Sequence, residues 1–184
     1  TFGWYDFEPK DYRWFYNMML VASNAGRHTS QQTPIIPFVH WHTTAPPDNP
    51  DPSVEQFSKE KYQELLWHML LRGHDTFFLW CTGRELATEI QLVHEVYRES
   101  LQYSGFIDRG VPIEFDVPSK PGPVVSGLRL GNRVLARRTD FGTGTGNETL
   151  ALAGGGEVSV AAKRGMQILT VEQTSRHTGI LSDH

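Results

Sequence analysis

Two histidines separated by one residue are the most chemically specific feature of the sequence. His40 and His42 follow the apolar run from Pro34 to Val39, and residues two apart on a strand point to the same face. Imidazoles placed in this way can hydrogen-bond a sugar hydroxyl or a carboxylate, or transfer a proton. They can also hold a metal ion together with further ligands, and two structural histidines are a third interpretation.

A tryptophan at the end of another apolar run could supply a flat binding surface. Trp80 lies near the end of the segment Thr76 to Cys81, which has the composition of a strand. An indole ring can stack on the apolar face of a pyranose, although the alternative is a tryptophan in the core. Trp41 alternates away from the two histidines, so we expect it to pack beneath a helix.

Two carboxylates near the amino terminus are candidates for acid–base chemistry. Asp6 and Glu8 lie two residues apart after an aromatic segment, and paired carboxylates at a strand end can act as general acid and as nucleophile or base. Tyr5 could orient either of them. Solvated loop carboxylates are the commoner alternative. Glu85 is better explained as a carboxylate that complements a helix dipole.

The elements that must position these residues alternate between strand and helix. One predicted strand ends before Glu8, and two more span Pro34–Thr43 and Thr76–Cys81. The predicted helices are Tyr12–Ala25, a helix that begins at the cap Ser53 and is ended by Gly73, and Arg84–Tyr103. Apolar residues recur at helical spacing in each helix, and Ser53 with Gln56 suggests a capping box. Three strand–helix units in a row predict a parallel α/β arrangement, which places the carboxyl ends of the strands at a common edge.

The composition changes after Ile107. Short alternating segments and glycine-rich turns predict antiparallel strands, with Gly131-Asn132 as a hairpin turn. We therefore predict an α/β segment over residues 1–105, an all-β domain of the antiparallel β-sandwich type over 106–173 and a tail over 174–184. The pairs Arg137-Arg138 and Lys163-Arg164 are predicted to be ordinary solvated charges.

The motifs P-I-I-P-F-V-H-W-H and L-L-W-H-M-L-L-R-G-H-D-T-F-F-L-W, followed by a long helix and a small β domain, resemble the last three strand–helix units of a (β/α)8-barrel glycoside hydrolase with its carboxyl-terminal β domain. A fainter similarity to hyaluronidases rests on the segment W-Y-x-F-x-P and the tryptophan of the last strand. The resemblance covers about residues 1–105. It implies carboxylate acid–base hydrolysis of a glycosidic bond, with His40, His42, Trp80 and Tyr5 contacting the sugar and Asp6 and Glu8 as catalytic candidates.

One departure from this family pattern affects the catalytic residues. Many retaining barrel hydrolases carry a nucleophilic glutamate at the end of the seventh strand, where this sequence has His40-Trp41-His42. Either the family is a different one, or at least one catalytic carboxylate comes from earlier strands that this sequence does not contain. We accordingly expect a companion amino-terminal segment or an oligomer mate that completes the barrel. A chain that starts at Thr1 within an aromatic pattern is typical of a segment of a longer protein.

Composition and charge exclude several classes of partner. A net charge of −4 over 184 residues provides no basic stripe for nucleic acid, and no apolar run approaches the roughly 20 residues of a membrane-spanning helix. We expect an oligo- or polysaccharide substrate, no cofactor and no metal. The alternatives are a metal-dependent hydrolase using His40 and His42, or a non-catalytic glycan-binding module. The single Cys81 leaves the compartment open, with a secreted or periplasmic location as one option.

Overall fold

The computed structural model describes residues 10–28, 33–41, 57–79, 86–142 and 144–173. The first half contains α1 (Lys10–His28), β1 (Phe38–Val39), α2 (Lys59–Leu70), β2 (Phe78–Leu79), α3 (Leu86–Ser100), a 3-10 turn (Leu101–Tyr103) and α4 (Ser104–Arg109). The second half contains β3 (Val111–Pro112), β4 (Pro123–Leu130), β5 (Arg133–Asp140), β6 (Glu148–Ala151), β7 (Glu157–Val160) and β8 (Met166–Thr170). None of the described helices is long and apolar enough to span a membrane.

Helix α2 begins later than the sequence pattern indicated. Its N-cap is Ser58, whose hydroxyl accepts a hydrogen bond from the Lys61 N–H at 3.2 Å, so the prediction that Ser53 caps this helix is wrong. The predicted core positions of α2 are confirmed, because its apolar residues are almost completely buried. Gly73, with φ +89°, follows the helix end and turns the chain toward β2.

The two short strands β1 and β2 pair in parallel, as the strand–helix–strand pattern predicted. Phe38 lies opposite Phe78 and Val39 opposite Leu79, and α2 forms the connection between them. Both strands are shorter than predicted. The Phe38 and Phe78 rings stack with centroids 5.4 Å apart, and both side chains are more than half exposed. Val39 points the other way, into the core.

The second half forms two antiparallel sheets. The larger has the strand order β3-β4-β5-β8 and the smaller pairs β6 with β7. Gly131 and Asn132 join β4 to β5 by a two-residue turn, with Leu130 opposite Arg133 and Gly131 at φ +63°, which confirms the predicted hairpin. Valines from both sheets share a small core: Val125, Val134, Val158, Val160 and Val171.

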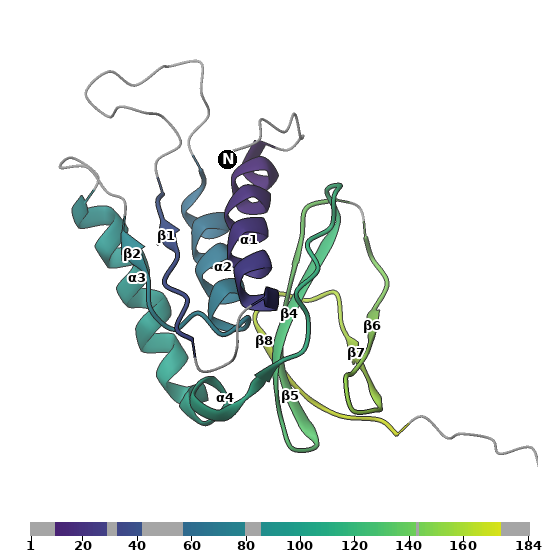
Figure 1. Cartoon of the computed structure of the whole chain (residues 1–184). Coiled ribbons are helices and arrows are strands. Elements are labelled where there is room, and N and C mark those ends of the chain that lie inside the picture. The colour runs from purple at the N-terminus through teal and green to yellow at the C-terminus, as the bar shows by residue number, and fades with distance from the viewer. Residues whose placement is uncertain (1–9, 29–32, 42–56, 80–85, 143, 174–184) are drawn as a thin grey trace, which may run out of the picture.

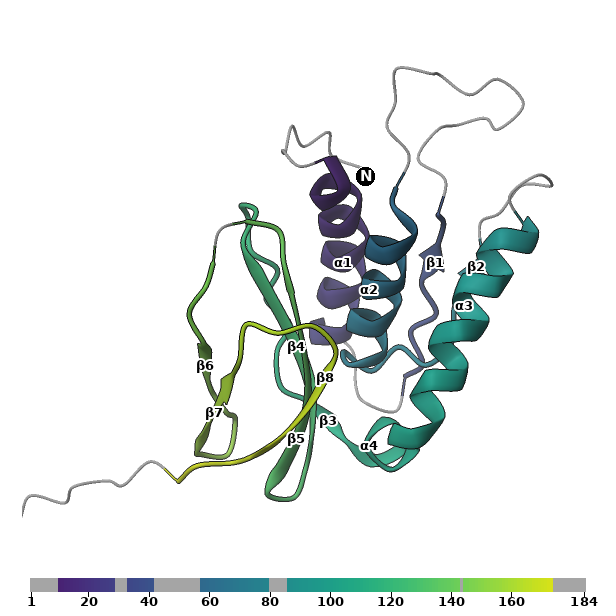
Figure 2. The same ribbon diagram turned by 180° about the vertical axis from the view of Figure 1, so that it is seen from behind.

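Helices α1 and α2 lie between the parallel strand pair and the four-stranded sheet (Figures 1 and 2). Their buried aromatic and aliphatic side chains form one core cluster with Val39 of β1 and with Val124 and Phe141 at the sheet. The rings of Tyr12 and Phe15 on α1 lie 4.9 and 4.8 Å from the ring of Phe141. The main core therefore joins the helical and β-rich parts of the chain.

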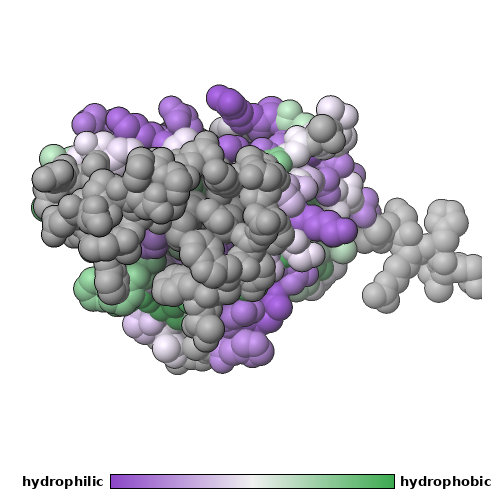
Figure 3. Space-filling view, turned by 90° about the horizontal axis from the view of Figure 1, so that it is seen from above, coloured by the Kyte–Doolittle hydropathy of each residue, from purple (hydrophilic) through white to green (hydrophobic). Residues whose placement is uncertain are grey.

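The fold is thus mixed α/β, with a parallel strand pair, three long helices and antiparallel sheets. Its finer description as part of a (β/α)8 barrel followed by a β-sandwich stays a prediction, as does the division at residues 105 and 173. In Figure 3, which shows the molecule from above, hydrophobic residues gather at one side of this end. The other described residues around it are mainly hydrophilic.

Candidate functional site

The carboxyl edge of the β1–β2 pair is where the predicted sugar-binding residues would meet. Because the strands are parallel, their carboxyl ends at Val39 and Leu79 lie at the same edge. His40 comes directly after β1 and its side chain is half-buried. His42 and Trp80 lie outside the described residues, and so do Tyr5, Asp6 and Glu8. The ends of both strands therefore share one edge, and His40 follows the first of them.

Trp41 anchors the segment after β1 to the helices. Its indole N–H donates to the Phe57 carbonyl oxygen at 2.7 Å, and the ring packs against the main core. The ammonium of Lys59 lies 5.5 Å from the centre of the indole ring. These contacts agree with the expectation that Trp41 packs beneath a helix, and they fix the backbone next to His40.

A buried glutamate that the sequence analysis missed lies at the same edge. Glu89 of α3 is fully buried, and its Oε1 accepts hydrogen bonds from the Trp41 backbone N–H at 3.1 Å and from the Tyr62 hydroxyl at 2.6 Å. Its Oε2 has no hydrogen-bond partner among the described residues. Glu89 therefore ties α2 and α3 to the end of β1, and its burial suits a positioning role better than direct contact with a substrate.

We expect Glu89→Ala to destabilise the fold by about 2–3 kcal/mol, because a buried N–H and a buried hydroxyl would lose their acceptor. Amide exchange at Trp41 should accelerate in parallel, while Glu89→Gln, which retains one acceptor oxygen, should lose less. Chemical unfolding and hydrogen-exchange measurements check this. If Glu89→Ala lowers the free energy of unfolding no more than the exposed control Glu99→Ala does, the anchoring role is contradicted.

Among the described residues no group of three or more histidine, cysteine, aspartate or glutamate side chains is arranged to hold a metal ion. His42, one half of the proposed metal pair, is not among them. The metal alternative is therefore a question for direct metal analysis.

A chain of buried hydrogen bonds connects α2 to β4 and β5. Both nitrogens of the fully buried His68 ring have hydroxyl partners, Ser126 Oγ at 2.8 Å from Nδ1 and Thr139 Oγ1 at 3.0 Å from Nε2. The Thr139 hydroxyl donates to the Glu64 carboxylate. Burial lowers the pKa of His68 to about 3, so the ring is neutral. These contacts fit a ring that accepts at Nδ1 and donates from Nε2.

Arg72 extends this network toward α1. It is 1% exposed, and its guanidinium donates to four oxygens in the protein interior. Nε reaches Ser126 Oγ at 2.8 Å and Nη1 reaches Ser23 Oγ at 2.8 Å, while Nη2 reaches the backbone carbonyls of Asp116 and Val125. Burial lowers the pKa of Arg72 to about 10. This residue links both helices to the sheet and is structural.

At its other end the network reaches an open cleft of about 520 Å³ between α2, α3 and β5. Arg137 and Glu64 form a bidentate pair there, with Nε at 2.8 Å from Oε2 and Nη2 at 2.7 Å from Oε1. The guanidinium carbon of Arg137 lies 5.1 Å from the centre of the Trp67 ring. Burial favours the neutral carboxyl of Glu64, but the Arg137 and Thr139 contacts lower its pKa overall.

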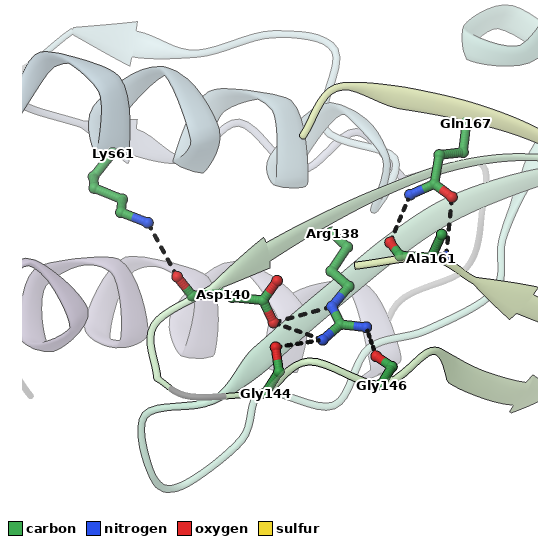
Figure 4. Close-up of polar contacts among 7 residues, drawn as sticks. All are labelled: Lys61, Arg138, Asp140, Gly144, Gly146, Ala161 and Gln167. Atoms are coloured by element: carbon green, nitrogen blue, oxygen red, sulfur yellow. Dashed lines mark hydrogen bonds and ion pairs between the residues drawn. The ribbon is translucent and has the colours of Figure 1, made fainter. Parts of the chain in front are cut away.

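The neighbouring Arg138 holds the loop that follows β5. Figure 4 shows its guanidinium between the carboxylate of Asp140, at 2.8 Å, and the carbonyl oxygens of Gly144 and Gly146, at 3.4 and 2.5 Å. Arg137 and Arg138 are 8% and 3% exposed. The prediction that they form a solvated pair is therefore wrong: one faces Glu64, the other supports a glycine-rich loop. Lys163 and Arg164 are exposed, as predicted.

Comparisons with models of protein families, with curated proteins and with solved structures found no match for this chain. The similarity to barrel glycoside hydrolases therefore rests on the sequence motifs alone.

Proposed function

We propose that this chain forms part of the substrate site of a carbohydrate-active hydrolase, at the carboxyl edge of β1 and β2. The observation that carries this proposal is the parallel register of Phe38 with Phe78. In a parallel α/β fold, ligands bind beyond the carboxyl ends of the strands, and the histidines and Trp80 follow these two ends in the sequence. The motif resemblance adds the sugar as the substrate.

In this proposal the side chains have distinct roles. His40 and His42 hydrogen-bond the sugar hydroxyls and Trp80 stacks on the pyranose ring. Hydrolysis proceeds through an oxocarbenium-like transition state between two carboxyl groups. Asp6 and Glu8, oriented by Tyr5, are the candidates within this sequence, and a further carboxylate comes from a companion segment. Glu89 supports the site by holding the segment that contains His40 and Trp41 in place.

The exposed face of the parallel pair supports a companion. Parallel sheets are usually covered on both faces, whereas Phe38 and Phe78 are 59% and 55% exposed on β1 and β2. Two parallel strands cannot close a barrel. The additional strands would come from an amino-terminal segment or from an oligomer mate, and this companion would complete the substrate pocket. The finer fold that we propose is accordingly a (β/α)8 barrel followed by a β-sandwich.

Binding of soluble polysaccharides to the 184-residue chain tests the proposal. We expect His40→Ala, His42→Ala and Trp80→Ala each to weaken binding by up to about tenfold, because one hydrogen bond or stacking contact is worth about 0.5–1.5 kcal/mol. His94→Ala, an exposed histidine on α3, is the matched control. Binding that is retained in all three variants as fully as in His94→Ala would refute the sugar site.

Two further measurements separate the alternatives. If zinc is bound stoichiometrically through His40 and His42 and a chelator inhibits the protein, the two histidines are metal ligands of a metal-dependent hydrolase and not sugar contacts. Glycan binding without hydrolysis in the intact protein would favour a binding module. Hydrolysis that is lost in Asp6→Asn and Glu8→Gln supports the acid–base assignment.

A further inference from the structure

The cleft beside Arg137 is formed where β8 separates from β5. Pairing between the two strands ends at Arg137 opposite Met166, whereas β5 continues to Asp140. Gly165, with φ +85°, is in a backbone conformation that side chains rarely adopt, and it turns the preceding residues away from β5. The resulting cleft of about 520 Å³ has β5 and the turn before β8 on one side and α2 and α3 on the other.

The two sides of the cleft carry opposite charges. The helical wall presents Glu60, Glu95 and Glu99, together with Lys61, whose ammonium donates to the Asp140 carbonyl oxygen. The turn before β8 presents Lys163 and Arg164. Among the described residues, the Arg137–Glu64 pair joins the two sides at the floor of the cleft, and no ion pair of 4.0 Å or less joins Glu60, Glu95 or Glu99 to Lys163 or Arg164. The charges of each wall therefore remain available to a ligand that lies across the cleft.

One carboxylate of the acidic wall, that of Glu95, is oriented by neighbouring amides. Gln91 donates to Glu95 Oε1 at 3.0 Å and Gln63 donates to Glu95 Oε2 at 2.8 Å. These hydrogen bonds, Gln91 first, lower the pKa of Glu95. Both donors are neutral, so they orient the carboxylate without cancelling its charge. A cation that approached this wall would meet an oriented carboxylate.

The floor of the cleft contains a buried cation with one unused donor nitrogen. Nε and Nη2 of Arg137 bind Glu64, while its side chain is only 9% exposed and Nη1 has no hydrogen-bond partner within the described residues. A buried nitrogen without an acceptor is unusual in folded proteins. An anionic group above this floor would face the exposed cations Lys163 and Arg164 and lie near Arg137, whose charge is already paired with Glu64.

We propose that this cleft binds a bipolar ligand, whose anionic group faces Lys163, Arg164 and Arg137 while its cationic group faces Glu95 and Glu99. The cleft has the volume of a small-molecule site. A ligand of single charge would be repelled by one wall. The same chemistry is offered by a free zwitterion or by a peptide segment with opposite charges at its two ends. This site is separate from the proposed sugar site and does not depend on it.

Titration calorimetry and amide NMR shifts with the 184-residue chain test the site. The probes are the block peptide acetyl-Lys-Lys-Gly-Glu-Glu-amide, its all-lysine and all-glutamate counterparts, and 6-aminohexanoate as a free zwitterion. We expect the block peptide to bind at least about tenfold more tightly than either single-sign peptide at low salt, and more weakly as salt rises. Binding of 6-aminohexanoate would identify a free zwitterion as a sufficient ligand, and its absence a peptide.

Charge reversal provides the decisive control. Lys163→Glu with Arg164→Glu makes both walls acidic, so the block peptide should lose at least tenfold in affinity and the all-lysine peptide should gain. Glu95→Lys with Glu99→Lys makes both walls basic, so the block peptide should again lose at least tenfold in affinity and the all-glutamate peptide should gain. Combining all four changes gives two walls of opposite charge again, with the signs exchanged. The block peptide should then bind again, in the reversed orientation. Lys120→Glu, an exposed change outside the cleft, should change nothing.

Three results would overturn the proposal. The first is equal affinity for the block and single-sign peptides, and the second is no binding of any probe at millimolar concentration. The third is a block-peptide affinity that neither single-wall reversal alters. The substituted side chains are on the surface, and circular dichroism of each variant ensures that lost binding is not lost folding.

Discussion

Replacing Arg72 by methionine is expected to lower the free energy of unfolding by about 3–5 kcal/mol, because breaking a buried, fully hydrogen-bonded charge network leaves its partners unsatisfied. The hydroxyls of Ser23 and Ser126 and two backbone carbonyls would lose their donor. Methionine fills much of the arginine volume, so the loss reports the hydrogen bonds more than a cavity. Urea unfolding followed by circular dichroism measures it.

The matched control for this change is Arg109→Met, an exposed arginine at the end of α4. Its cost should stay within about 0.5 kcal/mol, as for most surface substitutions. Arg72→Lys should fall between the two variants, because one ammonium cannot reach four oxygens in different directions. Similar unfolding midpoints for Arg72→Met and Arg109→Met would contradict the structural role of the network.

The second large effect is a loss of stability in acid that originates at His68. Its pKa is about 3 in the folded protein and about 6.5 in an unfolded chain. Above pH 6.5 the ring is neutral in both states and stability is at its full value. As pH falls from 6.5 toward 3, only the unfolded chain takes up the proton, so the free energy of unfolding should decrease by up to about 1.4 kcal/mol per pH unit.

Other groups contribute in the same direction and must be separated from His68. Burial also lowers the pKa of His74. The pKa of Glu64 is lowered in the folded protein from its ordinary value of 4.5, so its stabilising contribution begins to be lost only when pH falls below 4.5. Unfolding at pH values from 5 to 7 therefore isolates the histidines. In His68→Gln the slope of the free energy of unfolding against pH should decrease by an amount that corresponds to nearly one proton. The change His74→Gln should decrease this slope further. An unchanged slope in His68→Gln would refute the assignment.

The parallel pair, the three long helices and the β4–β5 hairpin were predictable because their signals are local. Apolar runs mark β1 and β2, helical spacing marks α2, and Gly131-Asn132 marks the turn. The candidate sugar residues were chosen by the same local reasoning. Of these, His40 is placed beyond β1 as expected, while the others lie outside the described residues and stay predictions.

The buried polar network could not be predicted, because its partners are distant in the sequence. Glu64 and Arg137 are 73 positions apart and His68 and Ser126 are 58 apart. Each of these residues resembles an ordinary surface residue within its own segment. Only the packing of α2 on the sheet removes them from water and pairs them. Glu89 was missed for the same reason, since its partner Trp41 is 48 positions away.

The shared core around Phe141 has a consequence for how this chain can be divided. Tyr12 and Phe15 of α1 cover one side of that ring, and Val124 of the sheet belongs to the same cluster. A protein cut between the helical and β-rich parts would expose these surfaces to water on both fragments. The two parts therefore depend on each other thermodynamically, and a gene fusion or exchange that replaced either one would have to supply a matching apolar surface.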